Sequence, residues 1–245
     1  MPGAPCFTDG TEAGLLRSMA EAGIGAAVTV PVATKASQVP TINALAAAGA
    51  DPRLIRFGAL HPQGEDLKGQ VDFLRSHGIP GIKLHPEYQD FHVDDPACFR
   101  MYELLQAAGL IVVFHAGWDP GPFTRDHSRP EALRRVADRF PGLRMVAAHM
   151  GGYRMWDEVE RHLAGAPVWF DTSAACEALS GEDLARLARR HGVERVLFAS
   201  DSPWFSQAEA LRRIEAAPFT EAERERILWR NAEELLGKGK GMERG

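Results

Sequence analysis

The sequence has little cysteine, no excess of basic residues and no long apolar run. Its cysteines, Cys6, Cys98 and Cys176, are far apart and odd in number, which excludes a disulfide framework and predicts free thiols in a reducing compartment. A net charge of -5 provides no basic surface for nucleic acid. No apolar run approaches the roughly 18 residues of a membrane span, and no secretion signal is apparent. We therefore predict a cytoplasmic protein without nucleic-acid or membrane partners.

What the sequence does contain is typical of one globular domain. It has 245 residues, of which 45% are hydrophobic and 25% charged, enough for a single large α/β domain. No linker or composition break divides it, so we predict one domain over residues 1–245. Residues 237–245 are rich in glycine and charge and are expected to form a flexible tail.

Short apolar runs alternate with helical patterns along the chain. Ser128, Ser180 and Thr220 each precede an acidic residue by three positions, which is typical of helix N-caps or capping boxes. Strands that alternate with helices favour a parallel sheet, because parallel strands need crossover connections. The strand-like runs are Ala26–Ala33, Arg56–His61, Gly81–His85, Leu110–His115, Arg144–His149, Val168–Thr172 and Arg195–Ser200.

The fold that this alternation predicts is a TIM (β/α)8-type barrel without its first strand. Such a barrel has eight strands, whereas seven runs are present. The first recognisable element is a helix over Thr11–Ala22, and Pro2, Gly3 and Pro5 make the preceding residues poor strand material. A start codon placed inside a longer reading frame and a real loss of the strand both remain open. A doubly wound open sheet is disfavoured because no glycine-rich phosphate loop follows any run.

Polar residues close several of these runs. They are Lys83, His85, His115, His149 and Asp201. In a barrel the carboxyl ends of all strands face one pocket, so we expect these side chains to meet there. Imidazole and carboxylate groups gathered in one pocket are ligands for a divalent metal.

The alternation of strand side chains supports this convergence. It places His115 on the same face as Val113, and His149 on the same face as Ala147. Each polar group is thus predicted to point into the mouth of the barrel above apolar residues that fill its interior.

The segments GIKLHPEYQDF, VVFHAGW, AAHMGG, WFDTSAA and FASDSPW resemble the amidohydrolase-related (amidohydrolase 2) family of metal-dependent barrel enzymes. The resemblance covers roughly Thr8 to Leu236. It implies that His115 is a metal ligand, that Asp201 ligates the metal and exchanges a proton with its water, and that His149 orients or activates that water. The His-x-His pair that ordinarily ends the first strand of the family is absent, because no histidine precedes His61.

This resemblance implies a metal-dependent hydrolase, with zinc as the expected metal and a small amide, ester or lactone as substrate. A carboxy-lyase of the aminocarboxymuconate-semialdehyde decarboxylase type is the alternative, and a truncated, inactive barrel is a third. Lys83, His85, Trp118 and Trp204 are predicted to bind the substrate. For Lys83, a carbamylated bridge between two metals and an ion pair with Asp171 are further interpretations. The sequence leaves a homo-oligomer open.

Overall fold

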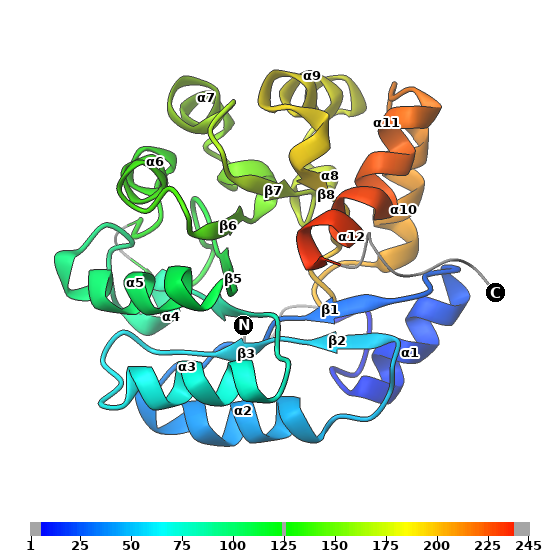
Figure 1. The fold of residues 1–245 in the computed structure, drawn as a ribbon. Helices are drawn as coiled ribbons and strands as arrows, with labels where there is room; N and C mark the ends of the chain where they lie inside the picture. Colours follow the sequence, from blue (N-terminus) through cyan, green and yellow to red (C-terminus); the bar gives the residue numbers. More distant parts are fainter. Residues whose placement is uncertain (1–5, 124–125, 238–245) are drawn as a thin grey trace.

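The computed structural model describes residues 6–123 and 126–237, and helices surround its short parallel strands (Figure 1). β1 pairs with β2, and β3 to β8 pair in sequence order, all in parallel. Sequential order without a switch point is that of a barrel, as predicted, and not of a doubly wound sheet. The strands are β1 (Ala27–Thr29), β2 (Leu54–Arg56), β3 (Gly58–Ala59), β4 (Gly81–Leu84), β5 (Ile111–Phe114), β6 (Arg144–Ala147), β7 (Trp169–Asp171) and β8 (Val196–Leu197).

All seven predicted runs contain a strand. The run predicted over Arg56–His61 begins earlier, at Leu54, and Phe57 alone separates its two parts, β2 and β3. The helices are α1 (Glu12–Glu21), α2 (Val39–Ala48), α3 (Leu67–Ser76), α4 (Pro86–Gln89), α5 (Phe99–Ala108), α6 (Pro130–Arg139), α7 (Trp156–Glu158), α8 (Ala175–Ala178), α9 (Gly181–His191), α10 (Gln207–Ala216), α11 (Glu221–Glu225) and α12 (Asn231–Leu236).

The helix ends follow the predicted caps in two of three places. Thr220 forms a reciprocal capping box with Glu223, and Ser180 accepts a hydrogen bond from the Asp183 amide. Ser128 does not cap a helix, because the N-cap of α6 is Arg129. Beyond Gly237, which ends α12, the predicted tail lies outside the described residues. No described helix has the length and apolar character needed to cross a bilayer.

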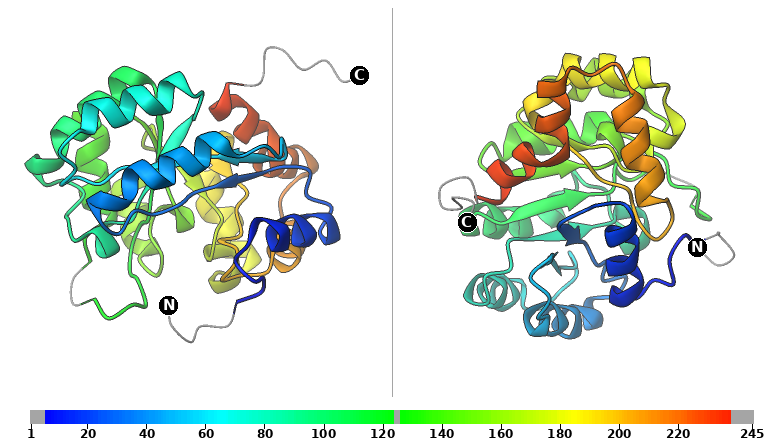
Figure 2. Two further views of the ribbon diagram at one scale, coloured as in Figure 1. Left: turned by 90° about the horizontal axis from the view of Figure 1, so that it is seen from below. Right: turned by 90° about the vertical axis from the view of Figure 1, so that its right-hand side faces the viewer.

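The barrel is open between β1 and β8, since no pairing joins these strands within residues 6–123 and 126–237. α1 and α10 lie side by side across this seam (Figure 2). The Phe7 amide also donates a hydrogen bond to the Pro203 carbonyl at 2.8 Å. Val28 and Val30 remain 39% and 37% exposed at the edge. The seam is thus bridged by a helix pair and not by strand pairing.

Apart from Lys83, the interior of the barrel is apolar below the mouth. Lys83, Val113, Val146 and Trp169 are partners in the register of β4 to β7 and form one row. At the amino-terminal ends of the strands, Leu235 of α12 packs into the interior cluster of Phe57, Ile111, Val113 and Val146. α12 therefore closes that end, and any site must lie at the carboxyl ends.

One predicted strand face is wrong. Val146, and not Ala147, points into the barrel, whereas Ala147 packs in the outer core between strands and helices. His149 nevertheless reaches the mouth, because it has a left-handed backbone with φ of 59° and is followed by Met150 with φ of 55°. Non-glycine residues rarely adopt this conformation, and it redirects the side chain away from the simple alternation.

Gln89 joins three strand ends at the mouth. Its side-chain amide donates to the Ala33 and Leu60 carbonyls at 2.9 and 2.8 Å, and its oxygen accepts from the His85 amide at 2.8 Å. The residue is 2% exposed. It therefore links the segments that follow β1, β3 and β4.

Replacing Gln89 with leucine is expected to lower the free energy of unfolding by about 2–5 kcal/mol, because three buried backbone groups lose their partner. Urea denaturation measures this effect. Gln63→Leu, at an exposed position, is the matched control and should change stability by less than about 0.5 kcal/mol. Equal stability of the two variants would contradict the linking role.

Candidate metal centre

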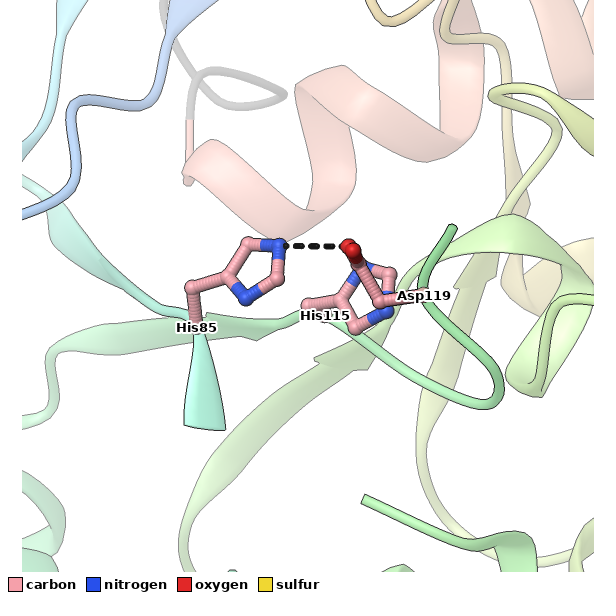
Figure 3. Close-up of side chains that lie close together, drawn as sticks. All are labelled: His85, His115 and Asp119. Carbon is pink, nitrogen blue, oxygen red and sulfur yellow. Dashed lines mark ion pairs between the residues drawn. The ribbon is translucent and has the colours of Figure 1, made fainter. Parts of the chain in front are cut away.

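The carboxyl ends of β4 and β5 bring two histidines and an aspartate together. One ligand atom from each of His85, His115 and Asp119 lies within 4.8 Å of the others (Figure 3). Asp119 Oδ2 is 3.4 Å from His85 Nε2 and 3.8 Å from His115 Nε2. The two imidazole rings are stacked, with centroids 4.2 Å apart. The sequence analysis expected both histidines at this mouth, His115 as a metal ligand and His85 as a substrate-binding residue, and it did not identify Asp119.

A chain of hydrogen bonds fixes the tautomer of His115. His149 Nδ1 lies 3.0 Å from the Ser173 carbonyl, which only accepts, so Nδ1 of the neutral ring carries the proton. His149 Nε2 is then the acceptor for His115 Nδ1, 3.1 Å away. The remaining nitrogen of His115, Nε2, therefore presents a lone pair to the pocket. A hydrogen-bonded second nitrogen is the usual environment of a metal-ligating histidine.

Glu87 is a second carboxylate that sequence reasoning missed. Its Oε1 accepts hydrogen bonds from the His127 amide at 2.9 Å and the Ser128 hydroxyl at 3.1 Å. Ser128 is fully buried, so it serves this carboxylate and not the helix cap that the sequence predicted. Glu87 Oε2 instead faces the imidazoles, 3.6 Å from His85 Nδ1 and 4.0 Å from His115 Nε2.

Burial governs the protonation of these groups. It lowers the pKa of His115 well below its usual value, helped by the neighbouring His85 and His149, and it lowers the pKa of His85. Burial raises the pKa of Glu87 against the effect of its hydrogen bonds. Burial also tends to raise the pKa of Asp119. Hydrogen bonds from His85 and the Gly121 amide outweigh this effect and hold the pKa of Asp119 below its usual value. Neutral imidazoles and ionised carboxylates are the forms that ligate metals.

The donors fit a divalent cation. Five buried side-chain polar atoms lack a hydrogen-bond partner in the part of the chain that the structure describes, and three of them are His85 Nδ1, Glu87 Oε2 and His115 Nε2. A lone pair of His115 that faces two carboxylates is unfavourable unless positive charge lies between them. Nitrogen and oxygen donors of this kind suit zinc and manganese.

Lys83 lies one layer below the histidines. Its side chain is buried, and no carboxylate of the described residues lies within the 4.0 Å of an ion pair, including that of Asp171. Asp171 instead accepts hydrogen bonds from the amides of His149 and Ser173. Burial lowers the pKa of Lys83, while the charges of Asp171, Asp201 and Glu87 oppose this shift. The amine is therefore close enough to interact electrostatically with these three carboxylates at the mouth of the barrel.

The other predicted site residues lie around this centre. Asp201 is exposed after β8, with a left-handed backbone and φ of 63°, and the group of potential metal donors found among the described residues does not include it. The Trp204 amide donates to the Asp201 carbonyl at 3.0 Å. Trp118 is 36% exposed and stacks on Tyr153 with ring centroids 6.3 Å apart. The roles of these residues stay predictions.

Comparison with known proteins identifies relatives of the same fold. Residues 9–238 match the amidohydrolase family model. No curated protein matches the sequence. The 5-carboxyvanillate decarboxylase LigW from Sphingomonas paucimobilis shares 19% identity, with a TM-score of 0.72 over 91% of this chain and 82% of its own.

Two further solved structures are similar. A dihydroxybenzoic acid decarboxylase from Polaromonas, with bound manganese and the inhibitor 2-nitroresorcinol, is 18% identical, with a TM-score of 0.71 over 94% of this chain and 87% of its own. An uncharacterised TIM-barrel protein from Bordetella bronchiseptica is 22% identical, with a TM-score of 0.70 over 93% and 83%. At these identities the likeness shows the fold, and the fold is that of a TIM barrel.

Proposed function

The chain belongs to the amidohydrolase family, and from that premise we propose that it is a metal-dependent decarboxylase of a small aromatic acid. The observation that carries the proposal is a buried amine, Lys83, one layer below the donor cluster and without a carboxylate within ion-pair distance among the described residues. A substrate carboxylate supplies that missing partner. Two solved structures of the same fold are those of decarboxylases that act on phenolic acids, and they support decarboxylation over hydrolysis.

His85, His115 and Asp119 would hold the metal. When bound, a divalent cation polarises the oxygen atoms of a carboxylate or phenolate that coordinates it. We propose manganese in preference to the zinc expected from the sequence, because carboxylate donors suit manganese and a relative of this fold carries it. The chain itself supplies the orientation of His115, through the hydrogen bonds of His149 to Ser173.

Aromatic side chains at the mouth suit an aromatic ring. Tyr88 lies edge-on to His85 with ring centroids 4.5 Å apart, and Phe123 lies 5.0 Å from Tyr88. Trp118, in the same loop after β5 as Phe123, stacks on Tyr153, which follows β6. Such surfaces bind a flat apolar ring through stacking and edge-to-face contacts. We place Trp204, which follows Asp201, among the walls of the same mouth.

The proposed reaction adds one proton and releases carbon dioxide. We assign to Asp201 the transfer of this proton to the ring carbon that carries the carboxylate. The bond between that carbon and the carboxylate then breaks, its electron pair returns to the ring, and carbon dioxide leaves. Lys83 holds the carboxylate before this step, because opposite charges attract each other more strongly in a buried site than in water.

Hydrolysis of a small amide, ester or lactone is the second candidate. The exposure of Asp201 favours it, because a solvent-accessible carboxylate is well placed to take a proton from water. The same residues would then hold the metal, and Lys83 would bind an anionic group away from the reacting carbonyl.

A substrate panel distinguishes the two candidates. We expect the purified chain with manganese to release carbon dioxide from 2,6-dihydroxybenzoate or 5-carboxyvanillate and to lose this activity with a chelator. Lys83→Met should raise KM for the acid by about 10–150-fold, since a hydrogen bond between charged groups contributes about 1.5–3 kcal/mol. Turnover of esters or lactones without carbon dioxide release from any acid would establish the hydrolase instead.

A further inference from the structure

We propose that Arg154 determines substrate specificity by binding a second acidic group of the substrate at the rim of the mouth, on the side of β5 and β6. The inference rests on the proposed function for the aromatic ring and for the carboxylate that Lys83 holds. It narrows the substrate to an aromatic acid that carries a second carboxylate. Arg154 is exposed in the segment that follows β6 and His149.

The segments that follow β5 and β6 are joined at the mouth. Gly117 and Tyr153 form a parallel bridge, and the Trp118 amide donates a hydrogen bond to the Tyr153 carbonyl at 3.0 Å. Gly117 has a φ of 88°, and a Cβ at this position would lie 2.3 Å from the Tyr153 nitrogen, so the close approach of the two segments requires glycine. The Tyr153 ring lies 6.0 Å from the ring of His149, measured between centroids. The joined segments are therefore fixed relative to the histidines of the mouth.

The guanidinium of Arg154 is held by aromatic rings and has no acidic partner. Its Cζ lies over Trp118, 4.9 Å from the ring centroid, and 5.5 Å from the ring centroid of Tyr153. Within residues 6–123 and 126–237, no ion pair or hydrogen bond joins this guanidinium to another residue. Arg129, by contrast, is paired with Asp126 and Glu158. Stacking uses the flat face of a guanidinium, so its N–H groups stay available to bind a carboxylate through two parallel hydrogen bonds.

The backbone at Arg154 is also unusual. Its φ is 57°, in the left-handed region that residues with a Cβ rarely adopt, and such residues gather at functional sites where the surrounding structure holds them. The conformation here follows directly from the bridge at Tyr153.

The surface beside the guanidinium suits the ring of the proposed substrate. Trp118 is 36% exposed and directly precedes Asp119 of the donor cluster. A flat ring that lies against Trp118 would place one of its substituents beside Arg154, and a carboxylate there would neutralise the unpaired charge.

Calorimetric titration of the manganese-loaded chain with two unreactive acids tests the proposal without turnover. Benzoate has one carboxylate, isophthalate has a second one on the same ring, and both lack the phenolic hydroxyl of the proposed substrates. We expect the unaltered chain to bind isophthalate more tightly, and Arg154→Gln to raise the Kd of isophthalate by about 5–20-fold and that of benzoate less than about twofold. Arg161→Gln is the matched control, because it removes the same charge from an exposed position in the helical segment Val159–Leu163 and should change neither Kd.

Turnover separates this inference from the proposed function. Arg154→Gln should raise KM for 5-carboxyvanillate, which has two carboxylates, and leave kcat and the KM for 2,6-dihydroxybenzoate nearly unchanged. Equal losses for both acids would mean that Arg154 only shapes the loops, and together with equal binding of benzoate and isophthalate by the unaltered chain they are the results that overturn the inference. An unchanged isophthalate Kd in Arg154→Gln overturns it as well. A chain that releases no carbon dioxide from either acid but binds isophthalate through Arg154 would contradict the proposed function and support the anion site.

Discussion

Replacing His115 with alanine is expected to abolish metal binding and to reduce turnover by about 10³-fold or more. Polarisation by a bound metal contributes several kcal/mol to a transition state, and each 1.36 kcal/mol corresponds to about a tenfold change in rate. His115 has this effect because it lies at the centre of the site. Its Nε2 faces Glu87 and Asp119, and its Nδ1 is bonded to His149.

Two measurements separate a lost ligand from a lost fold. The variant leaves His149 Nε2 without its donor, which costs about 1–3 kcal/mol of stability. Circular dichroism and a urea titration should therefore show a folded, somewhat less stable protein that holds no Mn²⁺ after dialysis. His92→Ala, at an exposed histidine, is the control and should bind the metal normally. Full Mn²⁺ stoichiometry in His115→Ala would show that the donor cluster is not the metal centre.

The barrel was predictable from the sequence because its strands are local features. Each strand is a short apolar run bounded by helix signals, and parallel pairing follows from the crossovers that separate the runs. The same reasoning found His85 and His115, since a residue that directly ends a regular strand keeps the strand's alternation. Ile111 and Val113 do fill the interior below His115.

The rest of the site depends on backbone that leaves the regular strand. His149 reaches the mouth through a left-handed conformation, which no alternation predicts, and Asp201 has one too. Glu87 lies in a short helix and is oriented by the amide of His127, far along the chain, whereas Asp119 lies in a loop and is oriented by the nearby Gly121 amide. The only signal in the sequence was an acidic residue two positions after His85 and four positions after His115. Surface acids are common at such positions, so this signal alone is weak.

Acid is expected to destabilise the fold through a histidine far from the mouth. His191, at the end of α9, is 1% exposed, stacks on Phe170 and donates from Nε2 to the Val168 carbonyl at 2.9 Å. Its Nδ1 accepts from the Gly165 amide at 3.3 Å, so a second proton on the ring would face another donor. Burial, with a smaller effect of Arg195, lowers the pKa of His191 to about 4.

The sign of the effect follows from proton uptake on unfolding. The unfolded chain has a histidine pKa of about 6.5. Between pH 6.5 and 4 it therefore binds a proton that the folded chain does not, and the free energy of unfolding decreases as the pH is lowered. A difference of about 2.5 pKa units corresponds to about 2 kcal/mol lost by pH 5 and about 3 kcal/mol by pH 4. Urea denaturation from pH 8 to 4.5 measures this loss. His191→Gln, which keeps a donor for Val168, should be less stable at pH 8 but lose less stability on acidification, whereas His77→Gln at an exposed position should follow the unaltered chain. An unchanged pH dependence in His191→Gln would mean that the loss of stability in acid arises elsewhere.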